Sequence, residues 1–154
     1  IIFESIQGVG GLDEPDTEFV KFLRGTCDKY DICLIADEVQ SGFGRTGDFF
    51  AFQKHDIKPD IIPMAKGMGN GFPVGGVLIN KKIKAKFGML GTTFGGNHLA
   101  CSAVLSVLDT MKQENLLKNS KNLGEYCKNK CSDIKILLSY YCNIIVIQEY
   151  NKIG

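Results

Sequence analysis

The stretch "ICLIAD", residues 32–37, decides the fold of this chain. It is apolar until its final residue and is too short for a helix, a combination typical of a strand buried on both faces. The runs at residues 1–3 and 58–66 have the same character, and the latter ends at Lys66. Because strands buried on both faces are typical of parallel sheets, we expect these runs to form a mainly parallel sheet.

Helical patterns separate the predicted strands. Residues 17–31 carry apolar side chains at helical spacing, which predicts an amphipathic helix. We expect a short aromatic helix at residues 49–55, a further strand at residues 75–80, and a long helical segment over residues 99–130 with a break near Glu114. Strands that alternate with helices are typical of an α/β fold in which helices flank a mainly parallel sheet.

The composition excludes several classes of partner. The chain has 154 residues, 44% hydrophobic content and a net charge of +1, which gives no electrostatic reason to expect nucleic acid or an anionic membrane. No apolar run is long enough to cross a bilayer. Cysteines are widely spaced in a chain with a sizeable apolar content, so we expect reduced thiols in a cytoplasmic protein. A zinc site at Cys127 and Cys131 is the weaker alternative.

One lysine lies alone among glycines. The segment "AKGMGNGFPVGG", residues 65–76, contains Lys66 as its only charge, and Asp37 ends the preceding predicted strand. Carboxyl ends of parallel strands share one edge of a sheet, so we expect both side chains on the same rim. Taken singly, a lysine or aspartate at a strand end is more often a surface or loop residue.

Together the two side chains suit pyridoxal 5'-phosphate. The aldehyde of this cofactor needs an amine, such as Lys66, to hold it as a Schiff base. Its ring nitrogen needs a carboxylate, such as Asp37, to remain protonated. Hydroxyl and backbone N–H groups of residues 91–96, "GTTFGG", are suitable donors for the phosphate.

Three long motifs carry a family resemblance. They are "LIADEVQSGFGRTGDFFAFQ" at 34–53, "PDIIPMAKGMGNGFPVGG" at 59–76 and "GTTFGGNHLACSAVLSVLD" at 91–109. Their order and spacing resemble those of class III aminotransferases, and most closely the acetylornithine and succinylornithine branch. The resemblance runs from Ile1 to about Lys130.

The resemblance implies both a fold and an activity. The fold would be the large, cofactor-binding domain of the fold-type-I pyridoxal-phosphate transferases, here incomplete. The activity would be ping-pong transfer of the δ-amino group of N-acetylornithine or N-succinylornithine to 2-oxoglutarate, in arginine biosynthesis. The complete enzyme would be a cytoplasmic homodimer. Ornithine- or GABA-type ω-aminotransferases remain an alternative.

The resemblance also implies cofactor-binding residues. Lys66 would be the catalytic lysine, which forms the Schiff base and shuttles a proton. Asp37 would pair with the pyridine nitrogen, and Val39 would pack against one face of the ring. Gln40 would hydrogen-bond the ring hydroxyl oxygen. Of these four residues, Lys66 alone would take part directly in bond formation and proton transfer.

Further positions concern the phosphate and the substrate. Thr93 would bind the phosphate across a dimer interface, and Glu4 matches a family glutamate near the substrate. Val9 stands where ornithine aminotransferases carry a second glutamate, which argues against free ornithine and favours an acylated one. His98 replaces a common proline, and we expect it at the surface of a helix N-terminus. Arg45 either guards the pocket or stabilises its loop.

The chain reads as a fragment, since it opens inside a predicted core strand. We expect residues 1–113 to be the central part of the large domain and residues 114–131 to be a helix that leads toward a small domain. Residues 132–154 read as a divergent or truncated tail with one or two strands. The alternative hypotheses are a truncated or frameshifted non-catalytic remnant and, third, an independent binding module.

Two apolar groups are predicted to pack inside. We expect the helical stripe of Leu99, Val104, Leu105 and Leu108 to be core. The aromatic cluster at residues 49–52 is predicted to be core or a dimer interface, because no basic patch accompanies it as in a nucleic-acid platform.

Overall fold

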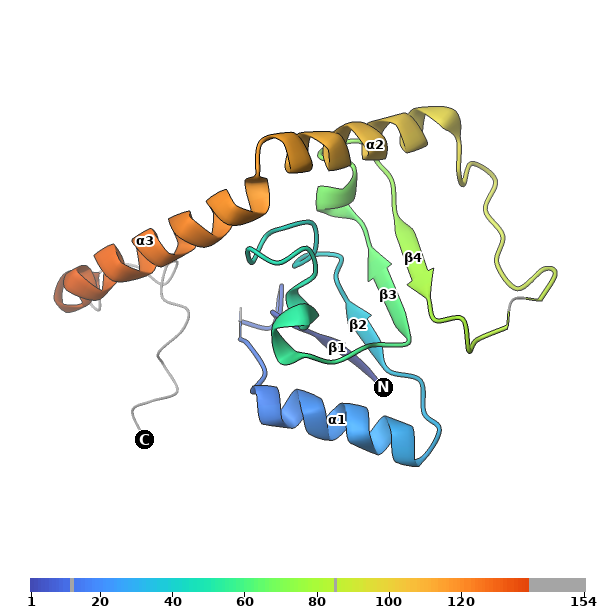
Figure 1. The fold of residues 1–154 in the computed structure, drawn as a ribbon, viewed down its shortest axis with the longest axis horizontal. Coiled ribbons are helices and arrows are strands. Elements are labelled where there is room, and N and C mark those ends of the chain that lie inside the picture. Colours follow the sequence, from blue (N-terminus) through green and yellow to red (C-terminus); the bar gives the residue numbers. More distant parts are fainter. Residues whose placement is uncertain (12, 85, 139–154) are drawn as a thin grey trace.

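A computed structural model describes residues 1–11, 13–84 and 86–138. Strands and helices alternate in the predicted order (Figure 1). The strands are β1 (Ile2–Glu4), β2 (Ile35–Asp37), β3 (Ile61–Met64) and β4 (Gly76–Ile79), the α-helices are α1 (Thr17–Lys29), α2 (His98–Gln113) and α3 (Leu116–Leu138), and the 3₁₀ helices are η1 (Ala51–His55) and η2 (Lys66–Met68).

The sheet has the order β1-β2-β3-β4. β1 pairs with β2 and β2 pairs with β3 in parallel, whereas β4 lies antiparallel to β3 at one edge. In Figure 1, α1 lies below the sheet and α2 lies across the end toward which β3 points. The predicted α/β architecture, a mainly parallel sheet with flanking helices, is therefore confirmed.

The core lies between α1 and the sheet. Val20 and Cys27 on α1 and Leu34 and Ala36 at β2 are fully buried. Asp16 caps α1 by accepting a hydrogen bond from the Glu18 N–H at 2.6 Å, so the predicted helix begins with an ordinary N-cap. Val20 and Cys27 of the predicted apolar spacing thus face the core, whereas Phe19 and Tyr30 of the same spacing are exposed.

The aromatic cluster is part of the same core. Phe50 and Phe52 are buried, and their rings stack with centroids 5.6 Å apart. Phe49 meets Phe50 edge-on at 4.7 Å. Contacts of this kind add to the stability that burial of the rings supplies. The prediction that this cluster is core is confirmed.

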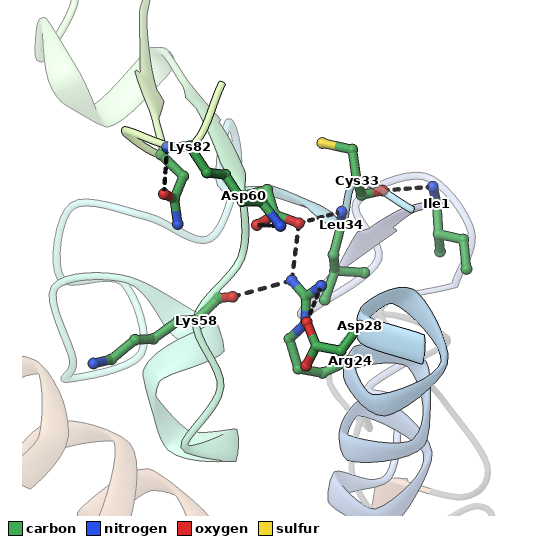
Figure 2. Close-up of polar contacts among 9 residues, drawn as sticks. Ile1, Arg24, Asp28, Cys33, Leu34, Lys58, Asp60 and Lys82 are labelled. Atoms are coloured by element: carbon green, nitrogen blue, oxygen red, sulfur yellow. Dashed lines mark hydrogen bonds and ion pairs between the residues drawn. The ribbon is translucent and has the colours of Figure 1, made fainter. Parts of the chain in front are cut away.

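An ionic cluster closes the end of the sheet opposite the predicted site (Figure 2). Asp60, which precedes β3, is 3% exposed. Its carboxylate accepts from the Leu34 N–H at 2.8 Å and from Arg24 at 2.9 Å, and it pairs with Lys82 at 2.7 Å. Burial by itself raises the pKa of Asp60, but these hydrogen bonds outweigh it and lower the pKa to about 2. The carboxylate thus ties α1, β2, β3 and the segment after β4 together.

Three expectations are wrong. Leu99 and Leu105 of the predicted core stripe are 73% and 61% exposed, because no described part of the chain covers that face of α2. Residues 132–138 continue α3 and are not a strand. β3 ends at Met64 and not at Lys66, because Lys66 takes a left-handed φ of 44°, which turns the chain out of the strand.

The loop between β4 and α2, residues 80–97, runs away from the sheet in Figure 1. His98 begins α2 at the surface, as predicted. None of the helices in the described part of the chain is long and apolar enough to cross a membrane.

Candidate active site

All predicted site residues except Thr93 lie at or just after the carboxyl ends of the parallel strands. Glu4 ends β1 and Asp37 ends β2, and the two residues are register partners. Lys66 follows β3 by two residues, at the start of η2. Parallel pairing of β1, β2 and β3 therefore brings two carboxylates, of Glu4 and Asp37, and the Lys66 amine to one rim of the sheet. The three residues are far apart in the sequence.

Lys66 has a strained backbone and a defined side-chain partner. Its φ of 44° is rare for a residue with a Cβ, and such strain clusters at functional sites. The turn is held by a hydrogen bond from the Met68 N–H to the Ala65 carbonyl at 2.9 Å. Lys66 Nζ donates a hydrogen bond to Gln40 Oε1. Two residues that the sequence placed in one site thus meet directly.

Close packing of two loops explains this contact. A Cβ on Gly67 would lie 3.3 Å from the Phe43 Cβ, so the backbone after Lys66 touches the loop that follows β2. Phe43 itself has a φ of 57°. The missing side chain at Gly67 favours this close approach, since an added Cβ would press against Phe43.

Glu4 and Gln40 are linked through the turn after β1. Glu4 Oε2 accepts a hydrogen bond from the Gly8 N–H at 2.9 Å. A Cβ on Gly8 would lie 3.4 Å from the Gln40 side chain and 3.6 Å from the Glu4 carboxylate. Glu4 thus bonds to Gly8, Gln40 bonds to Lys66, and the turn at Gly8 lies near the Gln40 side chain.

Asp37 organises the start of the loop after β2. Its Oδ1 accepts a hydrogen bond from the Val39 N–H at 2.9 Å, and both residues are half-buried. This bond leaves the second carboxylate oxygen of Asp37 for another donor. The role predicted for Asp37, to hold a protonated ring nitrogen, needs one such oxygen.

A hollow of about 530 Å³ opens beside Lys66. Its volume falls within the range of roughly 300–1,000 Å³ that is usual for ligand sites. Most of its wall is the glycine-rich segment at residues 65–67 and 70–74, and Arg45 contributes the remainder. Lys66 thus lines the hollow, while its amine contacts Gln40, which like Asp37 is not part of the lining.

Arg45 lies in a loop that the helical region holds in place. Its carbonyl accepts a hydrogen bond from the Ser120 hydroxyl at 3.1 Å. A Cβ on Gly47 would lie 2.8 Å from the Lys121 Cβ, and the φ of Gly47 is 94°. Both readings of Arg45 therefore have a basis, because its side chain lines the hollow and its backbone anchors the loop.

Thr93 is not brought to the rim. It lies in the exposed loop before α2, which Figure 1 draws away from the sheet. Its predicted role concerns a second copy of the chain, so it stays a prediction.

Sequence reasoning missed Glu38, which is 1% exposed directly after Asp37. The sequence does show two successive acidic residues, Asp37 and Glu38, directly after a buried strand. It does not show which of the two side chains points into the core.

Gly69→Ala is expected to disrupt the rim. A Cβ at this position would lie 2.2 Å from the Phe72 carbonyl oxygen and 2.6 Å from Val74, so the turn after Lys66 has to open. Urea unfolding should show a loss of about 1–3 kcal/mol.

Gly25→Ala is the matched control, because Gly25 lies within α1 and an added Cβ meets nothing within 4 Å. It should gain about 0.5–1 kcal/mol through helix propensity. Equal effects of the two substitutions would show that the turn tolerates a side chain.

Comparisons with known proteins agree with this geometry. The family model for aminotransferase class-III matches residues 1–140. Acetylornithine aminotransferase of Aquifex aeolicus is 44% identical over 136 residues, which are 87% of this chain and 36% of that protein. Ornithine aminotransferase 1 of Staphylococcus saprophyticus is 42% identical over 128 residues, 81% of this chain and 32% of that protein.

Solved structures give the same result for the fold. Ornithine aminotransferase of Plasmodium yoelii superposes with a TM-score of 0.79 at 36% identity, over 87% of this chain and 37% of that one. The chain thus spans about a third of the length of the curated relatives it matches. Motifs, fold and rim geometry lead to one conclusion, and the chain belongs to the class III aminotransferase family.

Proposed function

We propose that this chain carries the cofactor-binding rim of a pyridoxal-phosphate-dependent aminotransferase. Its amino donor would be N-acetylornithine or N-succinylornithine and its acceptor 2-oxoglutarate. The observation that carries the proposal is the contact between the Lys66 amine and the Gln40 amide, on the rim where Asp37 ends β2. Membership of the family supports this reading of the rim.

The donor set at the rim suits pyridoxal phosphate. Lys66 presents an amine that contacts Gln40, and the same residue lines a hollow of suitable size. Asp37 has a carboxylate oxygen outside its bond to Val39, and Gln40 offers an amide within reach of the same amine. Lys66, Asp37, Val39 and Gln40 would hold the group.

When bound, the cofactor supplies an electron-withdrawing ring that stabilises negative charge at the substrate Cα. The protein supplies proton transfer and position. Lys66 Nζ would accept the proton from the substrate Cα and return it, because it is the amine placed on the rim beside Gln40. Asp37 would hold the ring nitrogen protonated, and Glu4 would contribute to the substrate side of the same rim.

The proposal extends to assembly and location. Thr93 lies on an exposed loop, consistent with a phosphate contact to a second copy in a homodimer. The amino-acid substrates are small and water-soluble, as expected for a cytoplasmic enzyme. Arginine biosynthesis would be the pathway if the donor is an acylated ornithine.

Free ornithine is a second candidate donor. The similarity to ornithine aminotransferases of Staphylococcus saprophyticus and Plasmodium yoelii favours it. Val9, fully exposed after β1, is the feature that argues for an acylated donor, because a neutral side chain there offers no partner to a charged α-amino group.

Glutamate formation from 2-oxoglutarate tests the proposal. The protein is loaded with pyridoxal phosphate and supplied in turn with N-acetylornithine, N-succinylornithine, ornithine and GABA. We expect an acylated ornithine to give the highest kcat/KM. A higher kcat/KM with free ornithine would overturn the donor assignment, and cofactor binding without glutamate from any donor would favour a non-catalytic remnant.

A further inference from the structure

The buried carboxylate of Glu38 lies among the predicted site residues and has no part in the proposed reaction. Asp37 precedes it, and Val39 and Gln40 follow it. With a residue exposure of 1%, Glu38 cannot touch a ligand on the rim. A buried carboxylate is costly unless it is well hydrogen-bonded, so its partners indicate what it does.

Each oxygen of Glu38 accepts two hydrogen bonds. Oε1 accepts from the Phe52 N–H at 2.9 Å and from the Ser5 hydroxyl at 3.4 Å. Oε2 accepts from the Ala51 N–H at 3.0 Å and from the Ser41 hydroxyl at 2.9 Å. Glu38 belongs to none of the ion pairs found among the described residues, so neutral donors alone are seen to stabilise its charge.

Two of the four partners of the Glu38 carboxylate are chain neighbours of site residues. Ser5 follows Glu4, and Ser41 follows Gln40. Successive side chains of an extended segment point to opposite sides. Glu4 accordingly takes part in the rim, while Ser5 and Glu38 are buried beneath it.

The backbone of Glu38 forms two further hydrogen bonds that hold this buried residue in place. Its N–H donates to the Pro63 carbonyl of β3 at 3.0 Å, and its carbonyl accepts from the Gly42 N–H at 3.1 Å. The residue therefore joins the end of β1, the loop after β2, the start of η1 and the strand that leads to Lys66.

We propose that Glu38 is a positioning residue that fixes Glu4, Asp37 and Gln40 relative to Lys66, so that the rim is arranged before any ligand arrives. The inference rests on the proposed function, since the rim it arranges is the one assigned to pyridoxal phosphate. Preorganised side chains bind a ligand more tightly because less ordering accompanies binding.

Glu38→Gln tests the inference with little change of shape. Each carboxylate oxygen accepts one backbone N–H, from Ala51 or from Phe52, and a backbone N–H cannot reverse its role. Either orientation of the amide therefore sets an NH₂ group against a backbone donor. The buried anchor has to open whichever way the side chain turns.

The measurement is an absorbance titration of the folded protein with pyridoxal phosphate. We expect Glu38→Gln to raise the dissociation constant at least tenfold. Val20→Ala, a core truncation on α1 away from the rim, is the control for lost stability and should leave the dissociation constant within twofold. If Glu38→Gln does not fold, the pair Ser5→Ala and Ser41→Ala removes two anchors while both backbone bonds remain, and should raise the constant at least threefold.

The outcomes separate the two proposals. A wild-type protein that does not bind pyridoxal phosphate overturns the proposed function and this inference with it. A wild-type protein that binds, with an unchanged constant in Glu38→Gln or in the double serine variant, overturns the inference alone. An equal rise in Val20→Ala would likewise show that Glu38 acts only through overall stability.

Discussion

Lys66→Ala is expected to abolish the absorbance band that pyridoxal phosphate forms with the wild-type protein. The substitution removes the amine on the rim that contacts Gln40. A covalent bond to the cofactor needs that amine, so the loss should be complete and not a shift in affinity. The measurement is a titration followed in the visible range, with and without reduction by borohydride.

Two variants make this result specific. Lys66→Arg keeps the positive charge but cannot condense with an aldehyde, so it should also lack the band. Lys112→Ala removes an exposed lysine from the last turn of α2 and should behave as wild type. A band that persists in Lys66→Ala would contradict the assignment of Lys66.

Asp60→Ala is expected to destabilise the fold by about 2–3 kcal/mol, because it leaves the buried Leu34 N–H unpaired and takes one of two carboxylate partners from the partly buried Arg24 guanidinium. Figure 2 shows how the carboxylate links these groups. Urea unfolding at neutral pH measures the loss. Asp28→Ala is the matched control, since the Asp28 side chain is 65% exposed and its pair with Arg24 should contribute less than about 1 kcal/mol. A loss below about 1 kcal/mol in Asp60→Ala would show that the cluster is not a structural anchor.

The same cluster predicts the response to acid. The pKa of Asp60 is about 2 in the folded chain, against 3.8 ordinarily, so the unfolded chain binds a proton first as the pH falls. The stability from this group is present above pH 4 and is lost as the pH falls from about 4 to about 2. By linkage it amounts to roughly 2 kcal/mol. Asp60→Ala should lack this part of the pH dependence in unfolding curves.

The sheet was predictable because its strands are apolar on both faces. Residues 32–37 cannot expose either face without cost, which predicts a central parallel strand, and β2 is one. Parallel pairing then places Asp37 and Lys66 on one rim without any knowledge of their contacts. Element order followed from hydrophobic period, whereas the strands are shorter or shifted relative to the prediction: β2 begins at Ile35 and not at residue 32, and β3 ends at Met64, before the strained backbone of Lys66.

Contacts within the rim could not be predicted in the same way. The bond between Lys66 and Gln40 depends on how two loops pack at Gly67 and Phe43, which no period in the sequence encodes. Apolar spacing identifies the apolar face of α2, but it does not identify the part of a protein that packs against that face. Leu99 and Leu105 therefore remain exposed in the described part of the chain.

The central claim is that Lys66 is the residue that captures pyridoxal phosphate. Peptide mapping by mass spectrometry, after incubation with stoichiometric pyridoxal phosphate and reduction with borohydride, tests it most directly. We expect a pyridoxyl mass on the peptide that contains Lys66 and at most trace label elsewhere. Label spread over exposed lysines such as Lys112, with none enriched at Lys66, would contradict it.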